Sequence, residues 1–215
     1  MLNLEAKIQG IPNEEFGEPA SDEQIERTVR ALRANNIEAL VAKNGEQARQ
    51  MFFERIPEGA EVFLGSSVTL EALGIKEDVD TSGRFDALRP KLWAMDRATQ
   101  GREIRKWGAG PDYAAGSIQA VTESGQVLIA SNSGSQLGPY AFGAGKVIWV
   151  VGAQKIVRDL EEGMRRIDEY CVPLEEVHMQ QLFNAHTNVS KVLIVNKEIK
   201  PGRITMIIVK EELGY

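Results

Sequence analysis

The chain has 215 residues, of which 25 are Lys or Arg and 31 are Asp or Glu, so its formal net charge at pH 7 is −6. Hydrophobic residues make up 43% and charged residues 26% of the chain, a composition typical of a globular protein that can bury a core without metals or disulfides. The acidic balance argues against nucleic acid or an anionic membrane as a partner. The single cysteine, Cys171, cannot form an internal disulfide. We therefore expect a reducing compartment and a cytoplasmic protein.

Targeting signals and domain boundaries are the next features of the sequence. No stretch approaches the roughly 18 uninterrupted apolar residues of a membrane span, and residues 1–5 lack the basic and then apolar order of a signal peptide. Residues 1–20 mix Asn, Pro, Gly and Glu without periodicity, and we expect them to form a mobile or surface-bound lead. No linker rich in Pro, Gly and Ser interrupts the remainder, so residues 21–215 are predicted to form a single α/β domain.

The first part of that domain alternates helical and strand patterns. Ser21 and Gln24 form a capping-box pattern that predicts a helix over 22–35. The elements expected after it are a strand at 37–42, a turn at 44–45, a helix that stops before Pro57, a strand at 62–64, a turn at 65–67 and a helix through 70–74. This order favours a parallel sheet with helices on its faces, whose βα turns lie along the carboxyl edge where ligands usually bind.

The second part is less regular. The sequence predicts one helix at about 95–106 and a hairpin of strands 118–122 and 126–130. A loop with a short helix is expected at 131–145, followed by a strand at 146–152 that is buried on both faces. The remaining elements are a helix at 157–169, a further helix through Val177, and strands at 192–196 and 204–209. The hairpin turn is expected at Ser124 and Gly125. Pro173 is expected to break the chain between the two helices.

The turn after the second strand is the first candidate binding site. Gly65, Ser66, Ser67 and Thr69 would place backbone N–H groups and hydroxyls at a helix start, which suits a phosphate or carboxylate. The turn matches neither a Walker loop nor a dinucleotide fingerprint. The alternative is that Ser66 or Ser67 only caps the helix.

Two further candidates lie in the second half. Glu123, in the hairpin turn, could act as nucleophile or general base, although carboxylates in turns are mostly solvated. The loop at 131–139, including Asn132, Ser133 and Gly134, offers hydroxyls, amides and backbone donors for a polar ligand, or is only a connection.

Histidine and cysteine, the usual zinc ligands, are scarce in this sequence. His178 and His186 are the only histidines, and neither has the spacing of a zinc site, so neither a metal site nor a resident cofactor is expected. Cys171 is predicted to be a buried structural thiol.

Several separate motifs, taken in order, resemble the LUD domain of lactate-utilisation proteins, of the type found in lactate-utilisation protein C. They are 65–74, 117–125, 146–157, 159–162, 166–167, 173–174, 202–204 and 211–215. The resemblance covers most of residues 22–215. It implies a fold of the sugar-isomerase and CoA-transferase type, a three-layer α/β/α sandwich around a mainly parallel sheet. In relatives with this fold the first glycine turn helps to bind phosphate or CoA, and a catalytic glutamate precedes a glycine, so the corresponding positions here are Gly65 to Thr69 and the pair Glu123 and Gly125.

One segment departs from the pattern of this family. Many close relatives carry a cysteine-rich stretch between the penultimate helix and the last strands, whereas residues 183–190 here contain no cysteine. The resemblance therefore implies that electron transfer would fall to iron–sulfur partner proteins rather than to this chain.

Three functions remain open from the sequence. The first is a cytoplasmic, non-redox component of lactate-to-pyruvate metabolism with a small-molecule anion site. The second is an independent enzyme that binds a CoA-linked or phosphorylated small molecule and uses Glu123, and the third is a non-catalytic scaffold or regulatory subunit. A homo-oligomer is among the assemblies that these functions allow.

Overall fold

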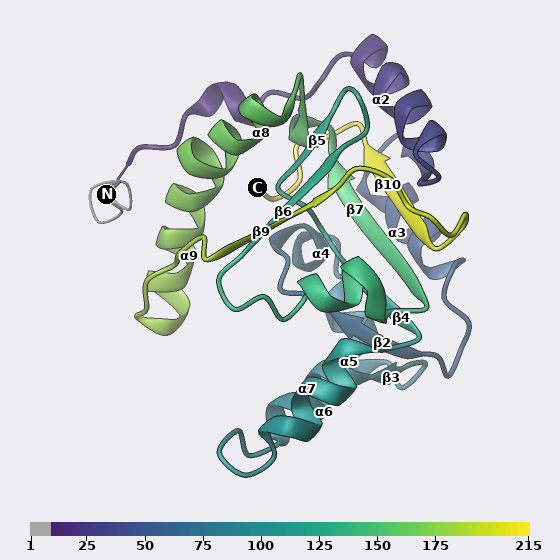
Figure 1. Ribbon diagram of the computed structural model, residues 1–215, viewed down its shortest axis with the longest axis vertical. Helices are drawn as coiled ribbons and strands as arrows, with labels where there is room; N and C mark the ends of the chain where they lie inside the picture. The colour runs from purple at the N-terminus through teal and green to yellow at the C-terminus, as the bar shows by residue number, and fades with distance from the viewer. Residues whose placement is uncertain (1–9) are drawn as a thin grey trace.

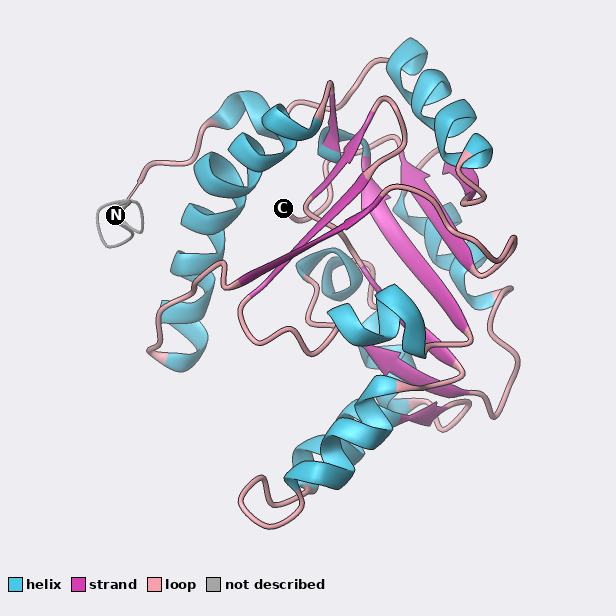
Figure 2. Ribbon diagram, in the orientation of Figure 1, coloured by secondary structure: helices cyan, strands magenta, loops and turns pink. Residues whose placement is uncertain are grey.

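A six-stranded parallel sheet forms the centre of the molecule (Figures 1 and 2). The structure is a computed structural model, and it describes residues 10–215. The strands follow the order β3-β2-β4-β7-β10-β1, and all neighbours run parallel. Their bounds are β1 Glu38–Ala42, β2 Glu61–Leu64, β3 Asp86–Ala87, β4 Tyr113–Gly116, β7 Lys146–Gly152 and β10 Ile204–Val209. Because all six are parallel, their carboxyl ends lie at one edge of the sheet.

Helices cover both faces of this sheet. Successive side chains of β7 point to opposite faces, so that Val147 and Trp149 belong to one buried cluster and Ile148 and Val150 to the other. Both faces of the sheet are therefore apolar and need a covering layer. The first cluster includes residues of α2 (Asp22–Ala34) and α6 (Leu88–Ala94), and the second includes residues of α3 (Gly45–Phe53), α4 (Val68–Ala72) and α5 (Ile75–Thr81). The expected three-layer α/β/α architecture is confirmed.

A smaller sheet is packed beside the first. Its order is β8-β5-β6-β9, in which β5 and β8 are parallel and the other pairs antiparallel. The bounds are β5 Ala120–Thr122, β6 Val127–Ser131, β8 Ile156–Val157 and β9 Lys191–Val195. One face contributes Val121 and Ile129 to the core of the large sheet, and the other contributes Ala120 and Leu128 to a cluster with Ile167. The hairpin predicted from the sequence is therefore confirmed, with Gly125 in its turn.

A long helical stretch flanks the smaller sheet (Figure 1). It consists of α8 (Leu160–Arg166), the π-helical turn η4 (Ile167–Cys171) and α9 (Val172–Phe183). The expectation that Pro173 breaks the chain is wrong, because Pro173 is the second residue of α9. Directly before it, the Val172 N–H donates to the Ile167 carbonyl five residues back. This wider turn and the first-turn position accommodate a residue that has no N–H to donate.

The other correction concerns the predicted helix at 95–106. The structure has two helices there, since α6 ends at Ala94 and α7 (Gly101–Ala109) begins after a turn. The Asp96 carboxylate accepts hydrogen bonds from the Ala98 N–H and the Thr99 hydroxyl, and these local bonds compete with a helix. By contrast, the predicted capping box at Ser21 and Gln24 is confirmed in both directions.

The predicted lead at 1–20 is only partly visible, because residues 1–9 lie outside the described residues. Asn13 donates from its backbone N–H to the Glu169 carbonyl at 2.9 Å and from its side chain to the Glu169 carboxylate at 3.1 Å. The short helix η1 (Glu14–Gly17) follows. In this part of the lead the chain runs along η4 rather than away from the domain.

Candidate functional site

The carboxyl edge of the large sheet brings four polar segments together. Residues 65–69 follow β2, Ser117 follows β4, the short helix η3 (Ala153–Lys155) follows β7, and residues 210–215 follow β10. The outer strand β1 leads into α3 at the same edge. This is the edge at which open α/β sheets usually bind ligands.

Lys155 lies at the centre of this arrangement. Its side chain is fully buried, and its Nζ donates to Thr69 Oγ1 at 3.1 Å, to Ser117 Oγ at 3.0 Å and to the main-chain oxygen of Tyr215 at 2.9 Å. These partners follow three different strands, so only the fold brings them to one point. Each partner is a hydroxyl or a main-chain oxygen, and none is a side-chain carboxylate.

The protonation of Lys155 is strongly perturbed. Burial, and to a smaller extent the positive charge of Arg166, lower the pKa of Lys155 from 10.5 to about 7. A lysine with such a pKa exchanges its proton near neutral pH. A negative charge placed next to Lys155 would therefore favour the protonated amine, and a positive charge would favour the neutral amine.

Arg166 is the second buried cation of the site. It is also fully buried, at the end of α8, and its Nε donates to the Gln154 carbonyl at 3.2 Å. Its Nη1 donates to the Gln119 carbonyl and lies 3.1 Å from Cys171 Sγ. Its Nη2 is buried and has no hydrogen-bond partner among residues 10–215. Since a guanidinium stays protonated, one donor of a permanent cation is left unsatisfied.

The described part of the chain provides no direct acidic partner for either cation. Within residues 10–215 neither Lys155 nor Arg166 forms an ion pair with an Asp or Glu side chain. The nearby carboxylates of Glu212 and Glu175 bind tyrosine hydroxyls instead, since Tyr170 donates to Glu212 and Tyr215 donates to Glu175. Buried charges are normally paired, so the side chains around Lys155 and Arg166 carry positive charge that no Asp or Glu balances directly.

Cys171 is buried, as the sequence predicted. Burial raises the pKa of its thiol, although Arg166 and Lys155 oppose that effect. A thiol in these surroundings stays protonated at neutral pH and does not balance the positive charge.

Tyr140 extends the site along the ends of β2 and β4. Its ring packs edge-on against Trp149 at 5.6 Å, and its hydroxyl approaches Gly65 and Gly116 so closely that a Cβ atom there would lie 2.9 Å and 2.1 Å from it. No hydrogen bond of this hydroxyl is recorded within the described residues. The side chain of Arg203 fixes the backbone of this turn by donating to the Tyr140 carbonyl at 3.0 Å. The Tyr140 hydroxyl thus lies against two glycines at the carboxyl edge.

The residues of the predicted glycine turn have different roles in the structure. Thr69 is buried and binds Lys155, and Gly65 is buried beside Tyr140. Ser67 instead caps α4, because its hydroxyl accepts the Leu70 N–H at 3.3 Å, and Ser66 is exposed. The capping alternative therefore applies to Ser67, whereas Thr69 lies in the Lys155 cluster.

Glu123 and Gly125 have a different set of neighbours. Glu123 accepts from Arg27 at 2.8 Å and from Gln24 at 3.2 Å, both on α2. The hydrogen bond from Arg27 is the largest of the influences that lower the pKa of Glu123. Gly125 has φ +81° and lies so close to α2 that a Cβ atom would be 2.8 Å from the Ala31 carbonyl carbon. No hydrogen bond among the described residues joins Glu123 to the turn at 65–69.

The loop at 131–138 approaches the glycine turn by a residue that the sequence did not single out. The Gly134 N–H donates to the Ser131 hydroxyl at 2.8 Å, Ser133 bonds to Ser135, and Asn132 accepts from Ser190 at 3.3 Å. These bonds hold the predicted residues Asn132, Ser133 and Gly134 within the loop and against the segment before β9. A Cβ atom on Gly65 would lie 3.5 Å from the Cβ of Gln136, so the loop reaches the sheet edge at that position.

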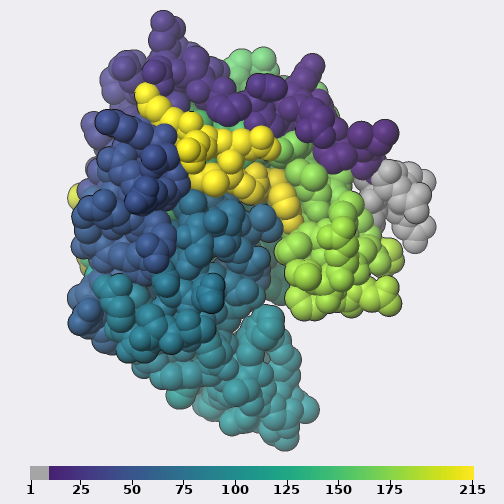
Figure 3. Space-filling view, turned by 180° about the vertical axis from the view of Figure 1, so that it is seen from behind, coloured from purple at the N-terminus to yellow at the C-terminus, as the bar shows by residue number. Residues whose placement is uncertain are grey.

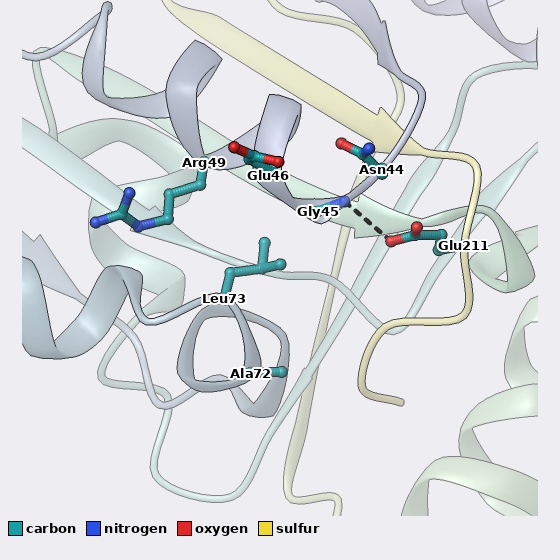
Figure 4. Close-up of a pocket in the computed structure, with 7 residues that line it drawn as sticks. All are labelled: Asn44, Gly45, Glu46, Arg49, Ala72, Leu73 and Glu211. Atoms are coloured by element: carbon teal, nitrogen blue, oxygen red, sulfur yellow. Dashed lines mark hydrogen bonds between the residues drawn. The ribbon is translucent and has the colours of Figure 1, made fainter.

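A separate pocket opens at the ends of β1 and β10 (Figure 4). It has a volume of about 440 Å³ and is lined by Asn44, Gly45, Glu46, Arg49, Ala72, Leu73 and Glu211. The Gly45 N–H at the start of α3 donates to the Glu211 carboxylate at 2.9 Å. The anion position at this helix terminus is therefore filled by the chain itself.

Comparison with known proteins identifies the family. The family model of the LUD domain matches residues 25–212. The chain belongs to the LUD domain family. This family is associated with lactate utilisation in general. A search of curated proteins gives no match.

A solved structure supports the fold of this LUD domain. A crystal structure of a DUF162 family protein from Deinococcus radiodurans aligns with a TM-score of 0.55 and 13% sequence identity, over 89% of this chain and 99% of that chain. At this identity the similarity shows the fold alone. Within residues 10–215 no helix is long and apolar enough to cross a membrane, and no three or more His, Cys, Asp or Glu side chains are grouped as a metal site would need.

Sequence reasoning missed Lys155, Ser117, Arg166 and Tyr140 as site residues. Three of them lie in motifs that carry the family resemblance, since 146–157 contains Lys155, 117–125 contains Ser117 and 166–167 contains Arg166. The available signal was a lysine within the apolar run that follows a buried strand, since lysine is rarely buried without a purpose.

Proposed function

We propose that this LUD-domain protein binds a small carboxylate- or phosphate-bearing molecule at Lys155, Thr69 and Ser117, and acts in lactate utilisation as a non-redox component. The family supports the metabolic setting in general terms. The position of the three residues at the carboxyl edge supports a ligand site there. Tyr140 and Gly65 would form the neighbouring wall.

The observation that carries the proposal is the buried positive charge that no Asp or Glu balances directly. Lys155 and Arg166 are both fully buried, and neither is paired with an Asp or Glu side chain within the described residues. An anionic ligand would supply the missing charge and would favour the protonated form of Lys155. The hydroxyl of Ser117 could then donate to the ligand, because a hydroxyl can both accept and donate, whereas Thr69 would first have to release the Leu213 carbonyl to which it donates.

Under this proposal, other proteins would carry out part of the oxidation of lactate. The chain has one cysteine, which is buried beside Arg166, and the pKa of its thiol is raised. We therefore assign electron transfer in lactate oxidation to iron–sulfur partner proteins, and place the protein in the cytoplasm. Its assembly as a homo-oligomer is compatible with this role.

The alternative is an enzyme that acts on a CoA-linked molecule or a phosphosugar with Glu123 as nucleophile or base. Arg27 and Gln24 occupy the two carboxylate oxygens of Glu123, and their hydrogen bonds lower its pKa. A general base is most effective when its pKa lies near the working pH, so these contacts weaken Glu123 in that role. The geometry favours Lys155 as the chemically active group.

Calorimetric titration of the purified protein tests the proposal. Lactate, pyruvate, inorganic phosphate and CoA would each be titrated into the natural protein and into the variants Lys155→Met and Lys146→Met. Lys146 is an exposed lysine and serves as the matched control. Loss of charge-assisted hydrogen bonds worth about 1.5–3 kcal/mol should weaken binding at least about tenfold in Lys155→Met and leave Lys146→Met unchanged. Equal affinity in Lys155→Met, or no binding of any anion, would contradict the proposal.

A further inference from the structure

The last five described residues cross the site that we assign to the ligand. We name residues 211–215 the closing segment. It leaves β10 without forming a helix or strand, and lies at the surface between the lead and the helices around residues 45–75 (Figure 3, yellow). Thr69 Oγ1 donates to the Leu213 carbonyl at 3.0 Å, and Lys155 Nζ donates to the Tyr215 main-chain oxygen at 2.9 Å.

Gln154 holds the middle of the closing segment. Its Nε2 donates to the Leu213 carbonyl at 3.2 Å and to the Gly214 carbonyl at 2.7 Å, and its Oε1 accepts the Leu213 N–H at 3.3 Å. Main-chain oxygens from three successive residues thus satisfy donors at the carboxyl edge. The side-chain amide of Gln154 therefore holds this segment beside the site through hydrogen bonds to its main chain.

We propose that residues 213–215 are an internal occupant of the Lys155 site and that a small carboxylate displaces them when it binds. This inference rests on the proposed function, because it assigns the ligand to the same site. In the closing segment, Lys155 binds the main-chain oxygen of Tyr215, and Thr69 binds the carbonyl of Leu213. A free carboxylate in the place of these two oxygens could accept from both donors, and its hydrogen bond to the buried ammonium would be charge-assisted.

The ends of the closing segment differ in how they are attached. Glu211 is fixed by its carboxylate to the Gly45 N–H (Figure 4), and its carbonyl accepts the Ala153 N–H at 3.1 Å. Glu212 accepts from Tyr170 at 3.2 Å. Residues 213–215 are held by hydrogen bonds to the side chains of Thr69, Gln154, Lys155 and Glu175. Their displacement would therefore break no hydrogen bond of a strand or a helix, while Glu211 and Glu212 would keep their own contacts.

Gly214 shows how closely the segment fits the site. Its φ is +57°, in the left-handed region, and a Cβ atom there would lie 2.6 Å from Thr69 Oγ1 and 2.8 Å from the Thr69 backbone nitrogen. A side chain at position 214 cannot coexist with the observed contacts. A substitution of Gly214 should therefore release the segment without changing Lys155 or its hydroxyl partners.

The test combines hydrogen exchange with binding on the full-length chain. Pyruvate and inorganic phosphate serve as the two probes, and the proteins are the natural chain, Gly214→Val, Gln154→Ala and the control Lys210→Ala. Lys210 is exposed and pairs with Asp22, away from Lys155. Gln154→Ala loosens the same segment without adding a side chain, so it replaces Gly214→Val if that variant does not fold.

The inference predicts that pyruvate accelerates exchange of the Leu213 amide in the natural protein. Gly214→Val and Gln154→Ala should bind pyruvate about tenfold more tightly, as for a site that is open about a tenth of the time. Lys210→Ala should bind as the natural protein does. Binding of phosphate with no release of the segment, while pyruvate releases it, would support the carboxylate assignment.

Three results would contradict the inference, and each has a different consequence for the proposed function. Pyruvate binding that depends on Lys155, with unchanged exchange at Leu213 and equal affinity in the Gly214 and Gln154 variants, would overturn the inference and leave the proposed function intact. Displacement by phosphate but not by pyruvate would overturn the carboxylate assignment. Absence of binding by both probes in the natural protein and in both loosened variants would overturn the inference together with the proposed function.

Discussion

Arg166 is linked to Lys155 through the main chain, because its Nε donates to the carbonyl of Gln154, the residue before Lys155. Its charge also contributes to the lowered pKa of Lys155. Two buried cations are thereby held in one network whose other members are hydroxyls, carbonyls and a thiol. The predictions below test the consequences of that arrangement.

The pH dependence of stability should reveal the buried lysine. The pKa of Lys155 is lowered to about 7 in the folded protein, against 10.5 in an unfolded chain. Between these values the unfolded chain binds more protons, so the free energy of unfolding contributed by this residue rises with pH. Below pH 7 both states are protonated and the contribution no longer changes. The difference in unfolding free energy between the natural protein and Lys155→Met should rise by about 1.4 kcal/mol per pH unit above pH 7.

Urea unfolding of both proteins at pH 7, 8 and 9 measures this difference. Other groups titrate in the same way in the two proteins, so they cancel to first order. A difference that stays constant over the range would show that Lys155 has an ordinary pKa.

Replacement of Arg166 should destabilise the fold. Arg166→Gln removes charge-assisted hydrogen bonds to the Gln154 and Gln119 carbonyls, and we expect a loss of about 3 kcal/mol. The neighbouring Arg165 is half exposed and pairs with Glu169 on the surface, so Arg165→Gln should cost at most about 1 kcal/mol. Chemical denaturation compares the two. Similar losses from both variants would mean that burial of Arg166 has no energetic consequence.

Close packing at Gly116 should couple it to Tyr140. The added methyl group of Gly116→Ala would lie 2.1 Å from the Tyr140 hydroxyl, and we expect destabilisation of about 2 kcal/mol. Removal of that oxygen in Tyr140→Phe should recover most of the loss in the double variant. Gly138→Ala is the control, because nothing lies within 4 Å of its Cβ position. Additive effects in the double-mutant cycle would disprove the contact.

Glu123 should matter little for anion binding. Its pair with Arg27 is partly exposed, so Glu123→Gln should lower stability by at most about 1 kcal/mol. Calorimetric titration with the anion that the natural protein binds should give an unchanged dissociation constant. A marked loss of binding or of a measured activity in this variant would instead favour the enzyme that uses Glu123.

Local patterns account for most of the fold. The continuous apolar run of β7 and the capping box at Ser21 predicted their elements, because each pattern is contained within a few neighbouring residues. The helix expected at 95–106 failed because the carboxylate of Asp96 binds the Ala98 N–H, which outweighs the surrounding helical spacing. Pro173 was misjudged because the π-helical turn before it is not visible in the sequence.

The candidate site was harder to predict for a spatial reason. Thr69 and Lys155 are 86 positions apart, and Ser117 and Lys155 are 38 apart, so no local motif contains the cluster. The turn at 65–69 was recognisable from its glycine and hydroxyls. Its partner Lys155 could be found only from the strand order, which places the ends of β2, β4 and β7 next to one another.

The central claim is that an anion pairs with Lys155, and nitrogen NMR of the lysine side chains tests it most directly. The Lys155 signal would be assigned by its absence in Lys155→Met and followed through a pH titration with and without saturating pyruvate. We predict a midpoint near pH 7 in the free protein and an increase of about one pH unit or more when pyruvate binds. A midpoint near the ordinary lysine value, or one that pyruvate leaves unchanged, would contradict the account.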